Sequence, residues 1–228
     1  MKKSFSLIEL IIVIIIVGVL YSSINFTLSN TSLNQAVDKL IAHINYTRHL
    51  ALKDNKMQYY PVNNTLEETN RSKYWFKGWW QLRIGKNSND YFYEIFSDSP
   101  DSSNIYDRKG NPVSEFAIDF YNGLYMAGNY VANSNKELNL SYYNIKVLKY
   151  NDVNLTMGNS IRIIFDNYGN CYTSEGSVGD GGDINPYDKD KRIPLMKISK
   201  ITLCQDDNCE NNLSICMSPK IGNAYLCK

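Results

Sequence analysis

The pattern of apolar and polar positions along this chain changes twice, near residue 28 and again near residue 73. From Phe5 to about Leu28 the side chains are mainly apolar, and Glu9 is the only charged residue between residues 3 and 38. From residue 33 to residue 52 apolar residues recur at steps of three and four, the spacing of a helix with one apolar face. Beyond residue 73 apolar and polar residues alternate in short runs, the spacing of β-strands.

The first two patterns predict one helix over residues 5–56. Its first part, residues 5–28, would be roughly 36 Å long at about 1.5 Å per residue, enough to cross a hydrocarbon core of about 30 Å. Two lysines precede this part, and the next basic residue is Lys39. We therefore expect a transmembrane helix with a cytoplasmic N-terminus and the rest of the chain outside. Residues 29–56 would continue it as an amphipathic helix that packs on a globular domain.

The third pattern predicts that residues 57–228 form one β-rich domain. Eight runs are expected to be strands, separated by turns rich in Asn, Asp, Gly and Pro: 80–84, 91–96, 116–120, 138–142, 145–150, 161–165, 195–203 and 213–217. The sequence has no second helical stretch of any length. The expected fold class is α+β, a long N-terminal transmembrane helix that continues into a globular domain of antiparallel β-sheet.

A short stretch near the N-terminus, Ser-Phe-Ser-Leu-Ile-Glu-Leu at residues 4–10, resembles the processing site of type IV pilins and type II secretion pseudopilins. The resemblance implies a leader of residues 1–4, which the prepilin peptidase removes between Ser4 and Phe5, and methylation of the new amine of Phe5. Glu9 is then fifth in the mature chain, as in the family. The family usually carries Gly where this chain has Ser4.

The resemblance gives Glu9 a role in filament assembly. A carboxylate in a membrane segment costs roughly 2.5 to 3.5 kcal/mol on insertion scales. When such helices bundle into a filament, the carboxylate can pair with the buried N-terminal amine of a neighbouring subunit. A buried charge without its partner costs about 3 to 5 kcal/mol, so the pair would fix the axial register of the subunits.

The expected function is a structural subunit, a minor pseudopilin or pilin of a type II secretion pseudopilus or a related type IV pilus. Its partners would be other pilin-like subunits, the prepilin peptidase and the inner-membrane assembly platform. It would lie in the bacterial inner membrane as a single-pass protein with a periplasmic C-terminal domain, and in the filament after assembly. Residues 41–52, with Arg48 and Ala51, and residues 165–171 also resemble stretches of the H-type minor pseudopilins.

Several other interpretations of the N-terminal segment stay open. It could be a secretory signal peptide cleaved near Ser22 or Ser23, although such a peptide has no use for Glu9. It could also anchor a single-pass membrane protein that has an extracellular binding domain and never enters a filament. A further alternative is a minor pilin that binds DNA for uptake.

The charge balance, 24 Lys plus Arg against 23 Asp plus Glu, argues against a general nucleic-acid partner but leaves room for a local basic patch. The candidate contacts for DNA are Lys191, Arg192, Lys197 and Lys200. Aspartates interleave with these residues, so a solvated surface of mixed charge is the alternative. DNA binding by such a patch would weaken steeply as salt rises.

All five cysteines lie in the last quarter of the chain, which the expected topology places in an oxidising compartment. Cys204 with Cys209 and Cys216 with Cys227 form one candidate pairing, with Cys171 left over. With one thiol free, about 15 pairings are allowed. A four-cysteine zinc site is a rival interpretation, but the sequence contains no C-x-x-C spacing.

A glycine-rich loop at residues 179–190 carries several oxygen ligands that suit Ca²⁺. The candidate ligands are Asp180, Asp183, Asp188 and Asp190. Major pseudopilins bind calcium in a C-terminal loop, but this loop lacks the residue order of an EF-hand, and a solvated connector is the alternative. No other cofactor is expected.

Catalytic motifs are missing from the sequence: it has no G-x-S-x-G, no Walker loop and no H-E-x-x-H. The only two histidines, His43 and His49, are six residues apart on the predicted helix and point about 240° from one another. We therefore interpret both as surface or interface residues and do not expect an enzyme.

Overall fold

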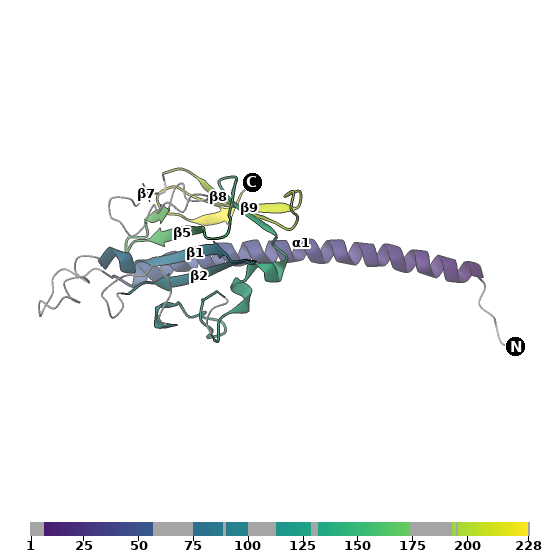
Figure 1. Ribbon diagram of the computed structural model, residues 1–228, viewed down its shortest axis with the longest axis horizontal. Coiled ribbons are helices and arrows are strands. Elements are labelled where there is room, and N and C mark those ends of the chain that lie inside the picture. The colour runs from purple at the N-terminus through teal and green to yellow at the C-terminus, as the bar shows by residue number, and fades with distance from the viewer. Residues whose placement is uncertain are drawn as a thin grey trace, which may run out of the picture.

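The computed structural model describes residues 7–56, 75–88, 90–99, 113–128, 132–173, 193–194 and 196–227, with only the backbone described for residues 21–30, 113 and 193–194. One long helix, α1 (Leu7–Lys53), forms the spine of the chain. Its first half projects away from the globular part, and its second half is embedded in it (Figure 1). The helix therefore ends three residues before the expected boundary at residue 56.

The transmembrane part of the expected fold class is wrong. Within the described residues, no helix combines the length and the apolar character that crossing a membrane requires. The uninterrupted apolar stretch of α1, residues 7–20 apart from Glu9, covers only about 21 Å at about 1.5 Å per residue, short of the roughly 30 Å of a hydrocarbon core. Polar side chains (Tyr, Ser, Asn and Thr) occupy most of the next ten positions.

Two five-stranded sheets, in which every ladder between the strands is antiparallel, flank the second half of α1. The first has the order β2-β1-β5-β6-β7 and contains β1 (Trp80–Lys86), β2 (Tyr91–Ser97), β5 (Ser160–Phe165), β6 (Cys171–Thr173) and β7 (Ile193–Pro194). The second has the order β10-β9-β8-β3-β4 and contains β3 (Val147–Tyr150), β4 (Val153–Asn154), β8 (Ser199–Cys204), β9 (Asn212–Met217) and β10 (Ala224–Leu226). The sequence therefore predicts the β-rich character of the domain correctly.

The apolar face of α1 packs against both sheets, and the helix and the sheets share one hydrophobic core. Leu40 and Ile44 are fully buried among side chains such as Leu82 of β1 and Ile201 of β8. Asn45 extends this packing to the sheet edge, because its side-chain amide donates to the carbonyl of Ala224 at 3.2 Å and its oxygen accepts from the Ala224 N–H at 3.1 Å. The helix thus satisfies backbone groups of the edge strand β10.

The opposite face of the first sheet is also buried, and it carries charges. Glu94 of β2 is 1% exposed and forms an ion pair with Arg83 of β1, with 2.7 Å between Nε and Oε1. Arg162 of β5 donates to the side chain of Gln81 at 2.7 Å. Burial raises the pKa of Glu94, although both arginines oppose that shift.

The segment at residues 138–142, expected as a strand, is instead helical. It belongs to two 3₁₀ turns, η3 (Lys136–Leu138) and η4 (Leu140–Tyr143). Asn135 and Asn139 cap them, each side chain accepting a hydrogen bond from the backbone N–H two residues further on. Such hydrogen bonds from an Asn side chain to the nearby backbone compete with strand pairing and favour turns. Two further 3₁₀ turns are η1 (Trp75–Gly78) and η2 (Val113–Glu115), and residues 116–120 form isolated bridges only.

Two disulfides close loops in the C-terminal sheet. Cys204 pairs with Cys209 and Cys216 with Cys227, the candidate pairing of the sequence analysis. The second bridge ties β9 to the residue that follows β10. Cys171 has a free thiol and is buried, and burial raises its pKa to about 12. This thiol lies against Gly222, where an added Cβ would come within 2.5 Å of Sγ.

Candidate functional site

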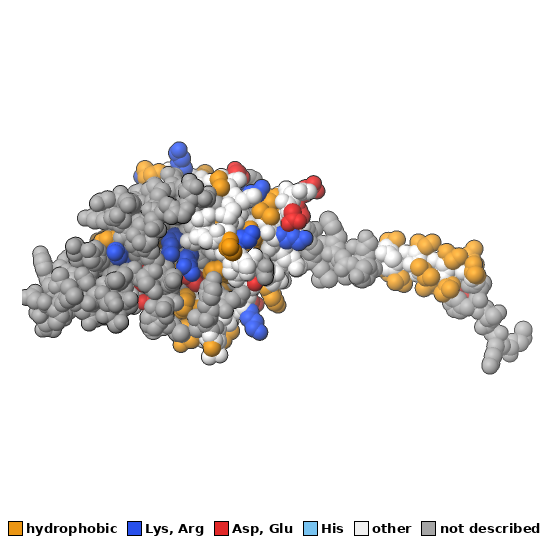
Figure 2. Space-filling view, viewed as in Figure 1, with side chains coloured by type: hydrophobic (Ala, Val, Ile, Leu, Met, Phe, Trp, Pro, Cys, Tyr) orange, Lys and Arg blue, Asp and Glu red, His pale blue; other side chains and the backbone are white. Residues whose placement is uncertain are grey.

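The first half of α1 carries an apolar surface that the domain does not cover (Figure 2). Twelve large apolar side chains between residues 7 and 20 are from 47% to 78% exposed. Consecutive helical positions point in all directions, so this surface surrounds the helix axis. A helix that is apolar all round normally lies buried, and exposed apolar surface on this scale marks an interaction site.

Glu9 lies in the first turn of this apolar surface and is exposed. The position near the helix N-terminus favours a negative charge, since the first backbone N–H groups of a helix carry partial positive charge. A partner that covers residues 7–20 would also cover this carboxylate, and a buried charge has to be paired or hydrogen-bonded.

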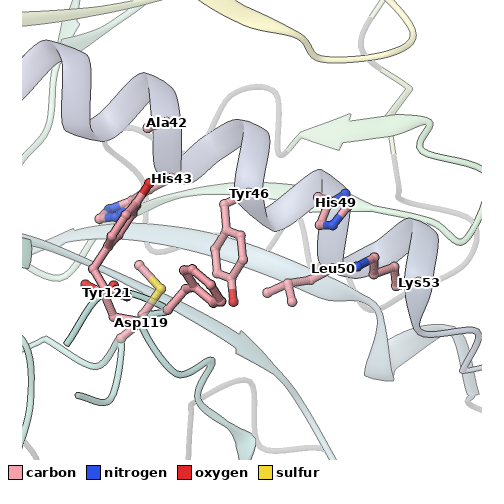
Figure 3. A pocket seen from close by; sticks show the side chains of 10 residues that line it. Ala42, His43, Tyr46, His49, Leu50, Lys53, Asp119 and Tyr121 are labelled. Atoms are coloured by element: carbon pink, nitrogen blue, oxygen red, sulfur yellow. Dashed lines mark hydrogen bonds between the residues drawn. The ribbon is translucent and has the colours of Figure 1, made fainter. Parts of the chain in front are cut away.

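A second surface lies on the embedded half of α1, where a groove of about 490 Å³ runs between the helix and the turn at residues 119–121. Figure 3 shows Tyr46 and Leu50 pointing from α1 into this groove, with Asp119 and Tyr121 on the opposite wall. We call it the α1 groove. Its lining residues are Ala42, His43, Tyr46, His49, Leu50, Lys53, Asp119, Phe120, Tyr121 and Met126.

Hydrogen bonds hold the turn at residues 119–123 in one conformation. Asp119 accepts from the Tyr121 N–H at 2.8 Å and from the side chain of Asn135 at 2.7 Å. Gly123 has a positive φ of 69° and donates its N–H to the carbonyl of Asp119 at 2.9 Å. The turn thereby presents two adjacent aromatic rings, those of Phe120 and Tyr121, which are 88% and 93% exposed.

Two polar side chains of α1 that line the groove, His43 and Tyr46, form hydrogen bonds within the chain. Nδ1 of His43 lies 2.7 Å from the hydroxyl of Tyr93, and burial lowers the pKa of His43, which favours the neutral ring. The hydroxyl of Tyr46 donates to the carbonyl of Ile118 at 3.2 Å. The groove thus combines hydrogen-bonded polar groups with apolar side chains such as Leu50 and Met126.

Residues 41–52 and residues 165–171 meet in the structure. Arg48 of α1 donates from Nε to the carbonyl of Gly169 at 3.2 Å, and Ala51 is buried one turn further on. Gly169 has a positive φ of 77° in a turn that Asp166 organises by accepting two backbone N–H groups. This contact fixes the end of α1 against the β5–β6 turn.

Most of the other predicted site residues lie outside the described residues. This holds for the processing site at Ser4 and Phe5, for the candidate calcium ligands at residues 180, 183, 188 and 190, and for Lys191 and Arg192. Among the residues that the structure describes, no group of three His, Cys, Asp or Glu side chains could hold a metal ion.

Two of the four basic candidates, Lys197 and Lys200, lie within the described residues. Lys197 is exposed. The ammonium of Lys200 forms an ion pair with Asp152 at 2.8 Å, and its backbone N–H donates to Asn151. An ammonium held by a carboxylate contributes less to a phosphate contact than a free one.

The sequence pattern does not predict the α1 groove. The Asn122–Gly123 pair signals a turn, but nothing in the local pattern shows that the preceding Phe120 and Tyr121 stay in solvent. His43 and His49 were expected at a surface or interface, and both line the groove. Comparison with known proteins adds no relative, since no family model, no curated protein and no solved structure matches this chain.

Proposed function

We propose that this chain is a pilin-like structural subunit, which assembles with other subunits into a filament of the type II secretion or type IV pilus class. The observation that carries the proposal is the uncovered apolar surface at residues 7–20, whose large side chains are 47% to 78% exposed. Such a surface needs a cover, and parallel copies of the same helix packed side by side would provide it. The N-terminal motif at residues 4–10 supports the same class of protein.

Glu9 has a specific task in this proposal. A peptidase cuts before Phe5 and methylates the new amine, and the Glu9 carboxylate pairs with that amine in the neighbouring subunit. Glu9 is the only charged side chain between residues 3 and 38. A buried charge that loses its partner costs about 3 to 5 kcal/mol, so the pair favours one axial register over the others.

The β domain forms the outer surface of the filament. Its two disulfides support a location in an oxidising compartment, because such bonds are rare where cytosolic reductants act. The buried second half of α1 joins the domain rigidly to the assembly helix. Forces on the filament core would therefore be transmitted directly to the domain.

Assembly of a Glu9→Ala variant tests the proposal. The variant should be cut before Phe5 as the unaltered chain is, but its yield of sheared filaments should fall by at least about tenfold because one buried ammonium per subunit loses its partner. Asp38→Ala is the matched control, since Asp38 is an exposed carboxylate on the same helix outside the apolar stretch. Normal filament yield from Glu9→Ala, or no filament from the unaltered chain, would contradict the proposal.

A further inference from the structure

The imidazole of His43 lies at the boundary between the α1 groove and the core. His43 lines the groove and is partly exposed, so water has access to the residue from that side (Figure 3). Nδ1 of the same ring lies 2.7 Å from the hydroxyl of Tyr93 in β2, a side chain that is 0% exposed. His43 therefore connects a fully buried hydroxyl to a surface that exchanges protons with solvent.

The hydroxyl of Tyr93 decides which state of the imidazole fits the core. Burial raises the pKa of Tyr93 well above its ordinary value, so the hydroxyl keeps its proton at neutral and acidic pH. Within the described part of the chain, the hydrogen bond of this hydroxyl is to Nδ1 of His43. A neutral imidazole that carries its own proton on Nε2 accepts the hydroxyl proton at Nδ1. A protonated imidazole has N–H groups at both positions and accepts nothing, so the buried hydroxyl would lose its acceptor.

We infer that the hydrogen bond between His43 and Tyr93 is an acid-sensitive contact, which holds α1 against the first sheet while the imidazole is neutral and weakens when the imidazole takes up a proton. The inference is independent of the filament role proposed above. Histidine is the side chain whose charge normally changes between about pH 5 and 8. The domain would therefore hold its helix less firmly in acidic surroundings and regain the contact at neutral pH.

Charged groups on the neighbouring elements act on the imidazole in both directions. The charged and titratable groups around it are Lys39 of α1, Tyr93 of β2, Asp119 of the turn, Glu137 of η3 and Tyr143 of η4. Burial has the largest effect and lowers the pKa of His43 from the ordinary value of 6.5; Asp119 and Glu137 oppose this shift, and Lys39 adds to it. Both carboxylates have partners of their own, since Glu137 forms an ion pair with Lys39 and Asp119 accepts from Asn135.

The lowered pKa fixes the sign of the pH dependence. Between the lowered pKa of the folded state and the ordinary value of 6.5, the unfolded state binds more protons than the folded state. The contribution of His43 to the free energy of unfolding should therefore fall as pH falls through this range. The unfolding equilibrium constant should change by about tenfold for each unit by which folding lowers the pKa of His43.

Urea unfolding of the full-length chain from about pH 7.5 to about pH 5 tests the inference. His43→Asn keeps a neutral side chain that can accept a hydrogen bond but takes up no proton in this range. His49→Asn is the matched control, because His49 is an exposed residue of the same helix. Groups such as Glu94 are common to all three chains, so their contributions cancel when the chains are compared at the same pH.

The unaltered chain and His49→Asn should lose stability as pH falls by more than His43→Asn does. The same pH dependence in His43→Asn and His49→Asn would overturn the inference, because the proton taken up by His43 would then have no effect on folding.

A nuclear magnetic resonance titration tests the role of Tyr93 directly and does not depend on how His43→Asn folds. The chain has two histidines, so labelled imidazoles give two signals, and His49→Asn assigns the one that belongs to His43. Tyr93→Phe removes the hydroxyl and keeps the aromatic ring. The midpoint of the His43 titration should move to higher pH in this variant, because the neutral imidazole loses the hydrogen bond that favours it. The His49 signal should be the same in both chains. An unchanged His43 midpoint in Tyr93→Phe would overturn the inference, since burial alone would then set the pKa of His43.

Discussion

The contact between Asn45 and β10 gives a quantitative test of how α1 holds the domain together. In Asn45→Ala, the N–H and carbonyl of Ala224 lose partners at 3.1 and 3.2 Å. Ala224 is 3% exposed, so water has little access to either group. An unsatisfied buried group costs about 1 to 3 kcal/mol, and two such groups predict a loss of about 2 to 6 kcal/mol in the free energy of unfolding.

Helix propensity works against this loss and has to be removed from the comparison. Alanine is favoured over asparagine in a helix interior by up to about 0.7 kcal/mol. Asn34→Ala provides the matched control, since Asn34 is an exposed residue of the same helix. The difference in unfolding free energy between the two variants then reports the contact with Ala224 alone.

Urea unfolding followed by circular dichroism, with both disulfides intact, measures that difference. With a urea dependence of about 2 kcal/mol per M, the midpoint of Asn45→Ala should lie about 1 to 3 M below that of Asn34→Ala. Hydrogen exchange should also show faster exchange of the Ala224 amide in Asn45→Ala. A difference in unfolding free energy below about 0.5 kcal/mol would refute the assignment of Asn45 as the cap of the sheet edge.

Three further predictions concern buried groups away from the assembly surfaces. Gly222→Ala should lower the free energy of unfolding by more than Gly158→Ala. Both glycines have a positive φ, which costs an alanine about 1 to 2 kcal/mol, but only at Gly222 would the new Cβ also lie 2.5 Å from Cys171. Equal melting temperatures of the two variants would contradict this prediction. The free energy of unfolding should fall as pH rises from the ordinary pKa of a glutamate to the raised pKa of Glu94, because the folded state binds more protons than the unfolded state in that range. In unfolding titrations of Glu94→Gln, the free energy of unfolding should no longer fall over this pH range. Burial raises the pKa of the Cys171 thiol to about 12, so alkylation by iodoacetamide at pH 8 should require unfolding, and rapid labelling of the folded chain would contradict its burial.

The sequence predicts the helix well because its signal is repeated many times. Apolar residues at steps of three and four from Leu33 onward face both sheets, and the observed end at Lys53 lies within one turn of the expected one. The error concerned what the apolar N-terminal part does. A run of aliphatic residues indicates an apolar surface, but the length of the run decides whether it could span a bilayer. The polar positions after residue 20 limit that length.

Short strands and caps were harder to predict. The strands β6 and β10 have three residues each, and the partner that fixes Ala224 in β10 is Asn45, 179 positions away in the chain. Conversely, residues 138–142 have a strand-like composition, but Asn139 starts a 3₁₀ turn by accepting from the Ser141 N–H. Both cases depend on a single side chain, which a pattern averaged over five residues does not record.

The α1 groove depends on tertiary structure in the same way. The groove forms because the turn at Asp119 folds back beside Tyr46. The hydroxyl of Tyr46 donates a hydrogen bond to the carbonyl of Ile118, which lies 72 residues further along the chain. The resemblance at residues 4–10, by contrast, rests on linear sequence alone, and the processing site that it implies stays a prediction.

The most direct test of the filament account is the mass of the N-terminal peptide of the chain isolated from the cells that make it. The account predicts a peptide that begins at Phe5 and carries one methyl group on its amine. A peptide that retains Met1, or one that begins near Ser22 or Ser23, would contradict it.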